Sequence, residues 1–378
     1  MKPIDLFRAE FWDNDDTASI IANLFAQGQQ GFWLPFTDFA SLTQDSAGTL
    51  PYTALEQPVG RVLDRSGRGN HASQVTSTAR GVVSARVNAL LSTDNPAAWG
   101  YVGTGFSVGS KDVDDGWPLT ALINSASALA AVNTDYPIGA GAVTDATIIR
   151  SIELQAGTAS FVRFGGASTT DAVVVDLVTK AIVYNLSTLP VTIVPLADNW
   201  VRVEFWASRA SFNATQLSNY LAWGLSQSGG VINATGQIGS TIKVRKPSYS
   251  RQALGYTAPV PFQRVGATST DYDAVGFPKY LRLDGTDDFY TCGGGGSTTG
   301  FYYSDVVMPT TSTFSALLAD NTASGGYLVQ RTNTGIYFSA NAGAAVTSVS
   351  LPLAANVQAF VSAMDDGVNL TLQVNSAQ

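Results

Sequence analysis

Side chains that carry most enzymatic and metal chemistry are scarce in this sequence. Its 378 residues include a single cysteine, Cys292, and a single histidine, His71. An internal disulfide and a cysteine-cluster metal site are therefore excluded. A single histidine also argues against histidine-based catalysis and against a histidine-rich zinc site. Only four of the 29 acidic residues are glutamates, which argues against catalysis by a pair of glutamates as well. The composition favours a β-rich protein that is not an enzyme.

Charge and long hydrophobic runs are also scarce. Charged residues make up 13% of the chain, against about 25% in an average soluble domain, and the formal net charge is −8. Phosphate binding needs a basic surface, which argues against nucleic acid as the main partner. No stretch approaches the roughly 18 apolar residues of a membrane span, and the N-terminus carries acids where a secretion signal needs an apolar run. We expect a soluble chain made in the cytoplasm, with no membrane span.

Strand-like runs, in contrast, are abundant. Short β-branched or aromatic segments such as SIELQAG, FVRFGG, VTIVPL, TIKVRKPSY, GIYFSA and NLTLQV are separated by Gly, Asn, Asp or Ser turns. In WVRVEFWA, the apolar residues 201, 203 and 205 alternate with Arg202, Glu204 and Trp206, which predicts two different faces. DAVVVDLVTKAIVYN predicts a hairpin that turns near Thr179 and Lys180. The whole pattern is typical of an all-β sandwich.

One segment near the N-terminus predicts a helix instead. Asp15 or Asp16 can cap the start of TASIIANLFAQ, and Gly28 follows at the expected stop. The apolar stripe of this helix consists of Ile20, Ile21, Leu24 and Phe25. A single helix this short is not stable alone, so its stripe must pack on the chain's own sandwich or on a partner subunit. Both alternatives are open.

Two distant segments, read together, resemble one family. VLDRSGRGNHASQ (Val62 to Gln74) and KYLRLDGTDDFYTC (Lys279 to Cys292) are similar to the D-x-S-G-N-G-N-H opening and the L-x-F-D-G-x-D-D-Y strand of laminin-G-like, concanavalin-type sandwiches. The later strand-like runs resemble the rest of that family, including a hairpin matched by residues 366–375. Family members have the two segments a few tens of residues apart, whereas roughly 200 residues separate them here. The resemblance therefore implies a domain inserted into a loop of the sandwich, which costs little loop-closure entropy.

The middle of the chain resembles a second family. DNWVRVEFWA (Asp198 to Ala207) and LAWGLSQSG (Leu221 to Gly229) are similar to two strands, D-G-W-x-R-V-x-V and W-G-x-Q, of the jelly-roll, carbohydrate-binding-like modules in phage and prophage structural proteins. The segment from Gly31 to Gln74 resembles the opening of phage tail or virion proteins with this arrangement. A shared sandwich does not define a function, so the resemblance implies fold more specifically than function.

These patterns predict an all-β fold, in which a concanavalin-like β-sandwich is interrupted by an inserted jelly-roll β-sandwich and preceded by a short N-terminal helix and arm. The arm and helix take residues 1–30 and serve attachment or oligomer contact. The split sandwich takes residues 31–87 and 260–378, and the inserted module takes residues 88–259. Family members usually continue with further strands, so the resemblance implies either a fragment or a sheet edge supplied by another copy.

Aromatic side chains are the first candidates for a ligand site. Trp206 shares its strand face with Arg202, and Trp117 lies in the loop DDGWP. Either ring could stack on a saccharide, while the arginine bonds sugar hydroxyls. Strand tryptophans also fill cores and subunit interfaces, so packing is the alternative role. Trp117, Trp206 and Arg202 are the carbohydrate-binding candidates.

Aspartates supply the candidate metal site. Asp284, Asp287 and Asp288 lie close together in the sequence, and Ca²⁺ prefers carboxylate and carbonyl oxygens. Aspartates also hydrogen-bond their own turns, so calcium binding and turn formation are both open. Asp64, in DRSGRGN, suits either role. His71 is expected to hydrogen-bond neighbouring backbone rather than to bind a metal.

No catalytic residue is assigned. Retaining glucanases need two carboxylates about 5 Å apart, which concanavalin-type enzymes supply from an E-x-D-x-E strand. The sequence has no such strand, and Glu153 and Glu204 are isolated in SIELQ and RVEFW. We expect both of them at solvent-facing strand positions.

The resemblances imply a bacteriophage virion structural protein, of a tail fibre or a baseplate, that binds bacterial surface glycan during adsorption. The alternative is a purely architectural virion component, such as a capsid decoration or collar protein. The expected partners are other virion proteins, sister chains in a homotrimer and the glycan. The expected location is the virion, assembled in the host cytoplasm.

Overall fold

A computed structural model of the chain describes residues 26, 32–99, 101–103, 106–121, 130–133, 147–165, 173–185, 190–208, 220–232, 239–251, 259–283, 288–292, 300–306, 314–319, 326–332, 335–342, 345–352, 359–365 and 370–376. Within these residues the chain forms antiparallel sheets, and helix is limited to 3-10 turns of three residues. The prediction of an all-β chain is confirmed. The helix predicted near the N-terminus lies outside the described residues, apart from Ala26 in a turn.

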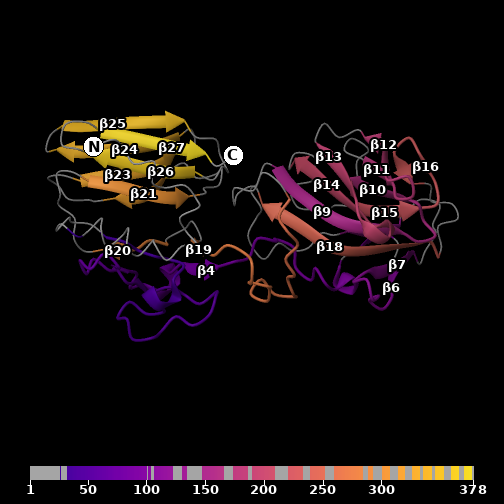
Figure 1. Cartoon of the computed structure of the whole chain (residues 1–378), viewed down its shortest axis with the longest axis horizontal. Helices are drawn as coiled ribbons and strands as arrows, with labels where there is room; N and C mark the ends of the chain where they lie inside the picture. The colour runs from indigo at the N-terminus through magenta and orange to yellow at the C-terminus, as the bar shows by residue number, and fades with distance from the viewer. Residues whose placement is uncertain are drawn as a thin grey trace.

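The largest unit contains two six-stranded antiparallel sheets and lies on the right of Figure 1. We call it the double-sheet unit. Its β10 sheet has the order β12-β11-β10-β15-β8-β5, and its β9 sheet has the order β13-β14-β9-β18-β7-β6. The β10 sheet consists of Tyr101–Gly103 (β5), Ala130–Asn133 (β8), Phe161–Gly165 (β10), Val173–Asp176 (β11), Ala181–Asn185 (β12) and Tyr220–Gly224 (β15). The β9 sheet consists of Phe106–Val108 (β6), Trp117–Ala121 (β7), Thr147–Ala156 (β9), Val191–Pro195 (β13), Val201–Ser208 (β14) and Thr241–Arg251 (β18).

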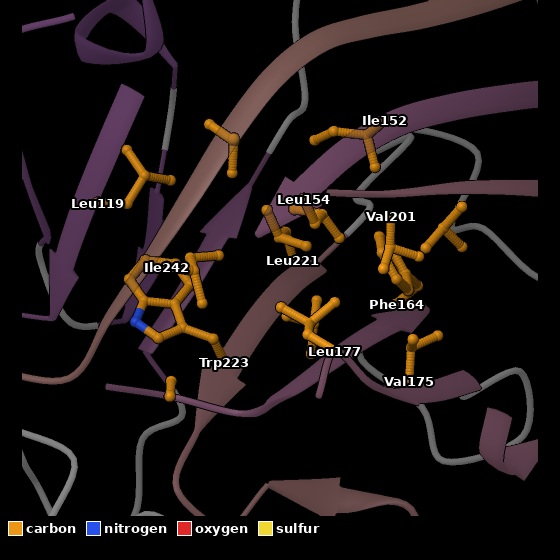
Figure 2. Close-up of a cluster of buried hydrophobic side chains, with 14 of the residues drawn as sticks. Leu119, Ile152, Leu154, Phe164, Val175, Leu177, Val201, Leu221, Trp223 and Ile242 are labelled. Atoms are coloured by element: carbon orange, nitrogen blue, oxygen red, sulfur yellow. The ribbon is translucent and has the colours of Figure 1, made fainter. Parts of the chain in front are cut away.

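The core of this unit lies between the two sheets, as Figure 2 shows. Alternate residues of each strand point into it, so Val201 and Val203 of β14 are fully buried while the residues between them face the other way. Trp223 of β15 is one of two buried tryptophans in the cluster, and its indole N–H donates to the Ser240 carbonyl at 3.1 Å. The buried indole is therefore also hydrogen-bonded.

The outer side of the β10 sheet is partly covered. A short hairpin of Gln227–Ser228 (β16) and Val231–Ile232 (β17) brings Ile232 against Val174, and both side chains are buried. The outer side of the β9 sheet has charged and polar side chains instead, as described below. The two outer faces of the double-sheet unit are therefore chemically different.

Two hairpins show how local sequence directs these sheets. Strands β11 and β12 pair as predicted, and the turn between them includes Lys180 with a positive φ of 56°. The Asp176 carboxylate accepts the backbone N–H of Val178 at 2.9 Å, which stabilises the turn. Between β13 and β14, Asp198 and Asn199 both have positive φ. Asp and Asn tolerate this conformation better than other residues with side chains, so they suit a tight hairpin.

A second unit, which we call the base, is built from short strands. Leu42–Thr43 (β1), Arg61–Val62 (β2), Ala72–Ser73 (β3) and Thr291–Cys292 (β20) form one sheet, and Val82–Ser84 (β4) pairs with Tyr280–Arg282 (β19). Ser73 lies opposite Thr291, and Ser84 lies opposite Tyr280. The segments on either side of the double-sheet unit are therefore hydrogen-bonded to each other.

The remaining strands form two further sheets. One has the order β21-β26-β27 and the other has the order β22-β23-β24-β25. Their strands are Gly300–Val306 (β21), Phe314–Ala319 (β22), Gly326–Thr332 (β23), Gly335–Ala342 (β24), Ala345–Pro352 (β25), Ala359–Asp365 (β26) and Leu370–Ser376 (β27). Strand β27 contacts β24 and β25, so the two sheets meet along this side. They lie at the upper left of Figure 1.

Candidate functional site

The outer face of the β9 sheet presents a set of paired polar side chains on three adjacent strands. Strand β9 lies between β14 and β18, and its Glu153 lies opposite Arg202 on one side and Arg245 on the other. Two residues further along β9, Gln155 lies opposite Lys243 of β18. We call this set, with Glu204 of β14, the polar face: Arg202, Glu204, Glu153, Gln155, Lys243 and Arg245.

Ion pairs order the centre of the polar face. Arg245 Nε lies 2.6 Å from Glu153 Oε2, and Arg202 Nε lies 2.8 Å from Glu204 Oε1. The Glu153 side chain is only 8% exposed, so it depends on its cationic partners to offset the lost hydration. Arg202 remains 40% exposed beside its own pair. The expectation that both glutamates are isolated and face solvent is wrong: Glu153 is buried next to Arg245, and Glu204, whose side chain is 15% exposed, is paired with Arg202.

A buried tryptophan packs against Arg245 at one end of the polar face. Trp200 is 1% exposed, and the guanidinium carbon of Arg245 lies 4.1 Å from the centre of its indole ring. The indole N–H donates to Asp114 Oδ2 at 3.2 Å. A Cβ on Gly116 would lie 2.8 Å from the Trp200 ring, so glycine is needed there for the close approach. These contacts attach the loop before β7 to the sheet.

Electrostatics strengthen the same attachment. Lys243 Nζ lies 2.6 Å from Asp112 and 3.7 Å from Asp114. Its hydrogen bond to Asp112 raises the pKa of Lys243 above the usual value. Burial acts to raise the pKa of Asp114, yet this pKa lies below its usual value because the Gly116 N–H, the Trp200 indole and two cations favour the carboxylate. The lysine ammonium occupies the position between these two aspartates.

The three carbohydrate-binding candidates do not converge on one surface. Arg202 lies on the polar face, and Trp206 follows it on the same strand, opposite Ile149 of β9, although its side chain lies outside the described part of the chain. Trp117 begins β7 opposite Val244, whose side chain is in the core. Its half-buried ring therefore packs on the core side of the sheet, with Lys111 Nζ 5.9 Å from its centre.

The calcium candidates fall largely outside the described residues. Asp284 and Asp287 are not among them, and Asp288, which is described, is half-buried. Among the residues that the structure describes, no group of three or more His, Cys, Asp or Glu side chains is arranged to hold a metal ion. Calcium binding at Asp284, Asp287 and Asp288 stays a prediction.

Asp64 and His71 organise a turn of the base. The Asp64 carboxylate accepts the backbone N–H groups of Trp33, Ser66 and Asn70 at 2.8 to 2.9 Å, and also the Ser66 hydroxyl. Burial acts to raise the pKa of Asp64, but these bonds outweigh it and hold the pKa below its usual value. The Asp64 N–H donates to His71 Nδ1 at 2.9 Å, so the histidine bonds neighbouring backbone as expected.

Sequence reasoning missed most of the polar face. Residue alternation in TIKVRKPSY places Lys243 and Arg245 on one side of a strand, and alternation in SIELQAG does the same for Glu153 and Gln155. It cannot reveal that these strands are neighbours, because Glu153 and Arg245 are 92 residues apart. The buried position of Trp200 depends on the same long-range pairing.

Comparison with family models and with curated proteins identifies no relative of this chain. No protein-family model matches it, and no curated protein matches its sequence. In the described residues, no helix is both long enough and apolar enough to cross a membrane.

Proposed function

We propose that the chain is a structural protein of a bacteriophage virion, in a tail fibre or baseplate, and that the polar face of its double-sheet unit binds bacterial surface glycan. The polar face supports the glycan-binding part of this proposal, and the resemblance of residues 31–74 and of the middle strands to phage structural proteins supports the virion part. Its donors and acceptors are spread over three adjacent strands and held by ion pairs, so little reorganisation is needed to meet sugar hydroxyls. Arg202 uses Nε for Glu204 and is 40% exposed, so a ligand can reach its guanidinium.

The strand order supports an inserted jelly-roll module at residues 88–259. Strands β7, β8, β9 and β10 alternate between the two sheets of the double-sheet unit, as consecutive strands of a jelly roll do. The β3–β20 and β4–β19 pairings support a split, concanavalin-like sandwich around it, made of residues 31–87 and 260–378. Residues 1–30 are then the attachment arm.

Binding at this face is expected to be weak in a single chain and useful in an assembly. A shallow, solvent-exposed sugar site has millimolar affinity, about −4 kcal/mol. A homotrimer on the virion presents several copies at once, and linked sites gain roughly 10² to 10⁴ in avidity where geometry permits. Trp206 lies on the same strand as Arg202 and is the proposed stacking partner, while Trp117, on the core side, is the less favourable one.

A purely architectural role is the second candidate, and one observation favours it. The charged side chains of the polar face already pair with one another, as Arg202 does with Glu204 and Arg245 with Glu153. The face is therefore complete without a ligand. The same pairing engages both carboxylates with arginines, which supports the proposal that the chain is not a glycosidase.

Capture of host cells or purified lipopolysaccharide by the oligomeric protein tests the proposal. Arg202→Ala should weaken capture about tenfold, because it removes charge-assisted bonds worth about 1.5 kcal/mol or more. Arg61→Ala is the matched control: this arginine lies in the base, where it bonds the Ala47 carbonyl, and its loss should leave capture unchanged. Absence of capture by the unaltered oligomer favours the architectural role. Release of new reducing ends from the glycan would instead indicate an enzyme.

A further inference from the structure

The chain enters and leaves the double-sheet unit at a single ordered place. We call it the junction: residues 85–99 on the way in and residues 263–273 on the way out. Ser92 N donates to the Gly266 carbonyl at 2.8 Å, and Thr93 N donates to the Val265 carbonyl at 2.9 Å. Val265 N also donates to the Thr93 hydroxyl oxygen, Oγ1, at 2.9 Å. Backbone pairing therefore holds the two connecting segments side by side.

Asn88 connects the junction to the double-sheet unit. Its side-chain amide is fully buried and donates to the Pro247 carbonyl of β18 at 3.1 Å and to the Gln263 carbonyl at 3.0 Å. Its Oδ1 accepts the backbone N–H of Tyr249, also in β18, at 2.9 Å. The amide thus bonds the longest strand of the unit and the returning segment simultaneously.

Gln263 makes the corresponding connection on the side of the base. Its Nε2 donates to the carbonyls of Ala85 and Asp273, each at 2.8 Å, and its Oε1 accepts the N–H of Val87 at 2.8 Å. This side chain is also fully buried. Both donor hydrogens of each amide are used, so a continuous path of hydrogen bonds runs from β18 through Asn88 and Gln263 to the segment that follows β4.

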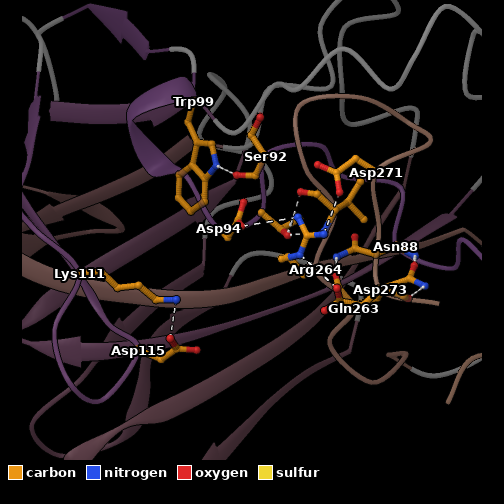
Figure 3. Close-up of polar contacts among 12 residues, drawn as sticks. Asn88, Ser92, Asp94, Trp99, Lys111, Asp115, Gln263, Arg264, Asp271 and Asp273 are labelled. Atoms are coloured by element: carbon orange, nitrogen blue, oxygen red, sulfur yellow. Dashed lines mark hydrogen bonds and ion pairs between the residues drawn. The ribbon is translucent and has the colours of Figure 1, made fainter. Parts of the chain in front are cut away.

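Side chains at the rim of the junction reinforce this path, as Figure 3 shows. Arg264 bonds Asp271 at 2.8 Å and Asp273 at 3.1 Å, and lies 3.8 Å from Asp94. The Trp99 indole donates to the Ser92 carbonyl at 3.0 Å. The aspartates are exposed, so the two buried amides, and not these ion pairs, dominate the coupling.

We propose that the junction is a rigid seat, which holds the double-sheet unit in one orientation relative to the base. Units of one chain that are joined by linkers ordinarily move relative to each other unless their contact is extensive. Swinging at this junction would expose or break the bonds of both buried amides, and buried amides without partners are strongly unfavourable. The seat does not depend on what the polar face binds, and it would serve a glycan-binding or an architectural protein equally.

Distance measurement between spin labels tests the seat in the full chain. Val178 in the double-sheet unit and Leu50 in the base are 64% and 52% exposed, so cysteines there, in a Cys292→Ser background, should be tolerated. The unaltered junction should give one narrow distance distribution, and Gln263→Ala should broaden it. Gln74→Ala is the matched control, because Gln74 is a buried glutamine of the base that bonds Phe289 and Thr76 away from the junction. A broad distribution with the native junction, or a narrow one in folded Gln263→Ala protein, overturns the proposal.

Hydrogen exchange supplies a second test that needs no variant. The amides of Val87, Thr93 and Tyr249 take part in the junction bonds. A rigid seat predicts that they exchange as slowly as the central β9 amides. Exchange of Val87 and Thr93 at the rates of unprotected amides, with β9 still protected, contradicts the seat even if Gln263→Ala protein does not fold.

Discussion

The double-sheet unit and the base achieve order by different means. The double-sheet unit has strands of eight to eleven residues at the centre of its β9 sheet, with alternating apolar residues that fill one core. The base has strands of two or three residues, whose backbone is held largely by side chains such as Asp64, Tyr290 and Gln74. The base has a smaller apolar cluster of its own, around Val59, Val62 and Val83, but side-chain-to-backbone hydrogen bonds hold more of its short strands than in the double-sheet unit. Single substitutions and pH should therefore affect the two units differently.

The largest expected effect is the loss of a core side chain from the double-sheet unit. Trp223→Ala removes an indole that is 1% exposed and leaves a cavity between the sheets. We expect a loss of about 3–5 kcal/mol in the free energy of unfolding, as for other buried aromatic truncations. Denaturant titration measures it, with Val183→Ala as the control because Val183 is 40% exposed. A loss below about 1 kcal/mol would mean that the core is not the main source of this unit's stability.

The base should respond most to a polar substitution. Asp64→Ala removes a carboxylate that accepts four hydrogen bonds from Trp33, Ser66 and Asn70. We expect a loss of about 2–3 kcal/mol, because bonds to a charged acceptor are stronger than neutral ones and the partly buried N–H groups lose this acceptor. Hydrogen exchange of amides in the base measures this, and Asp115→Ala in an exposed loop should have no comparable effect.

The same carboxylate should make the stability of the base depend on pH in the acid range. The folded-state pKa of Asp64 lies below its usual value of 3.8, so its stabilising contribution is complete above that value. The contribution is lost as the pH falls from about 3.8 through the lower folded-state pKa. In the Asp64→Ala protein, this part of the acid dependence should be absent.

Comparison of sequence and structure shows why only part of this contrast was predictable. Alternation in WVRVEFWA placed Val201 and Val203 on one strand face, which is the buried one, and a turn signal located the β11–β12 hairpin, because both depend on neighbouring residues. The Asn88–Gln263 pair joins residues 175 apart, and the Glu153–Arg245 pair joins residues 92 apart. Such contacts depend on which strands become neighbours, and this is decided by packing of the whole core.

Alkaline pH should destabilise the base more than the double-sheet unit. The described tyrosines with raised pKa lie in the base or, for Tyr272, in the junction: Tyr52, Tyr272, Tyr280 and Tyr290. Burial is the main cause, and it raises the pKa of Tyr52 from 10.0 to about 12. Because the folded-state pKa is raised, the stabilisation is complete below pH 10 and is lost as the pH rises toward 12. Amides of the base should lose protection in this range before those of β9, and Tyr52→Phe should reduce the difference.

The smallest expected effect concerns the polar face, where the double-sheet unit most resembles the base in its use of charged side chains. Arg202→Ala removes one partner of an ion pair with Glu204, whose side chain is 15% exposed, but the arginine itself is 40% exposed and solvent screens the pair. We expect a change within about 0.5 kcal/mol in the free energy of unfolding. Glu153→Gln should cost more than this, because Glu153 is 8% exposed and leaves Arg245, itself only 17% exposed, without its anionic partner. Denaturant titration of both variants measures the difference. Equal losses would show that the deeper burial of the Glu153–Arg245 pair does not strengthen it, and a large loss in Arg202→Ala would mean that its glycan-capture result reports folding rather than contact with the sugar.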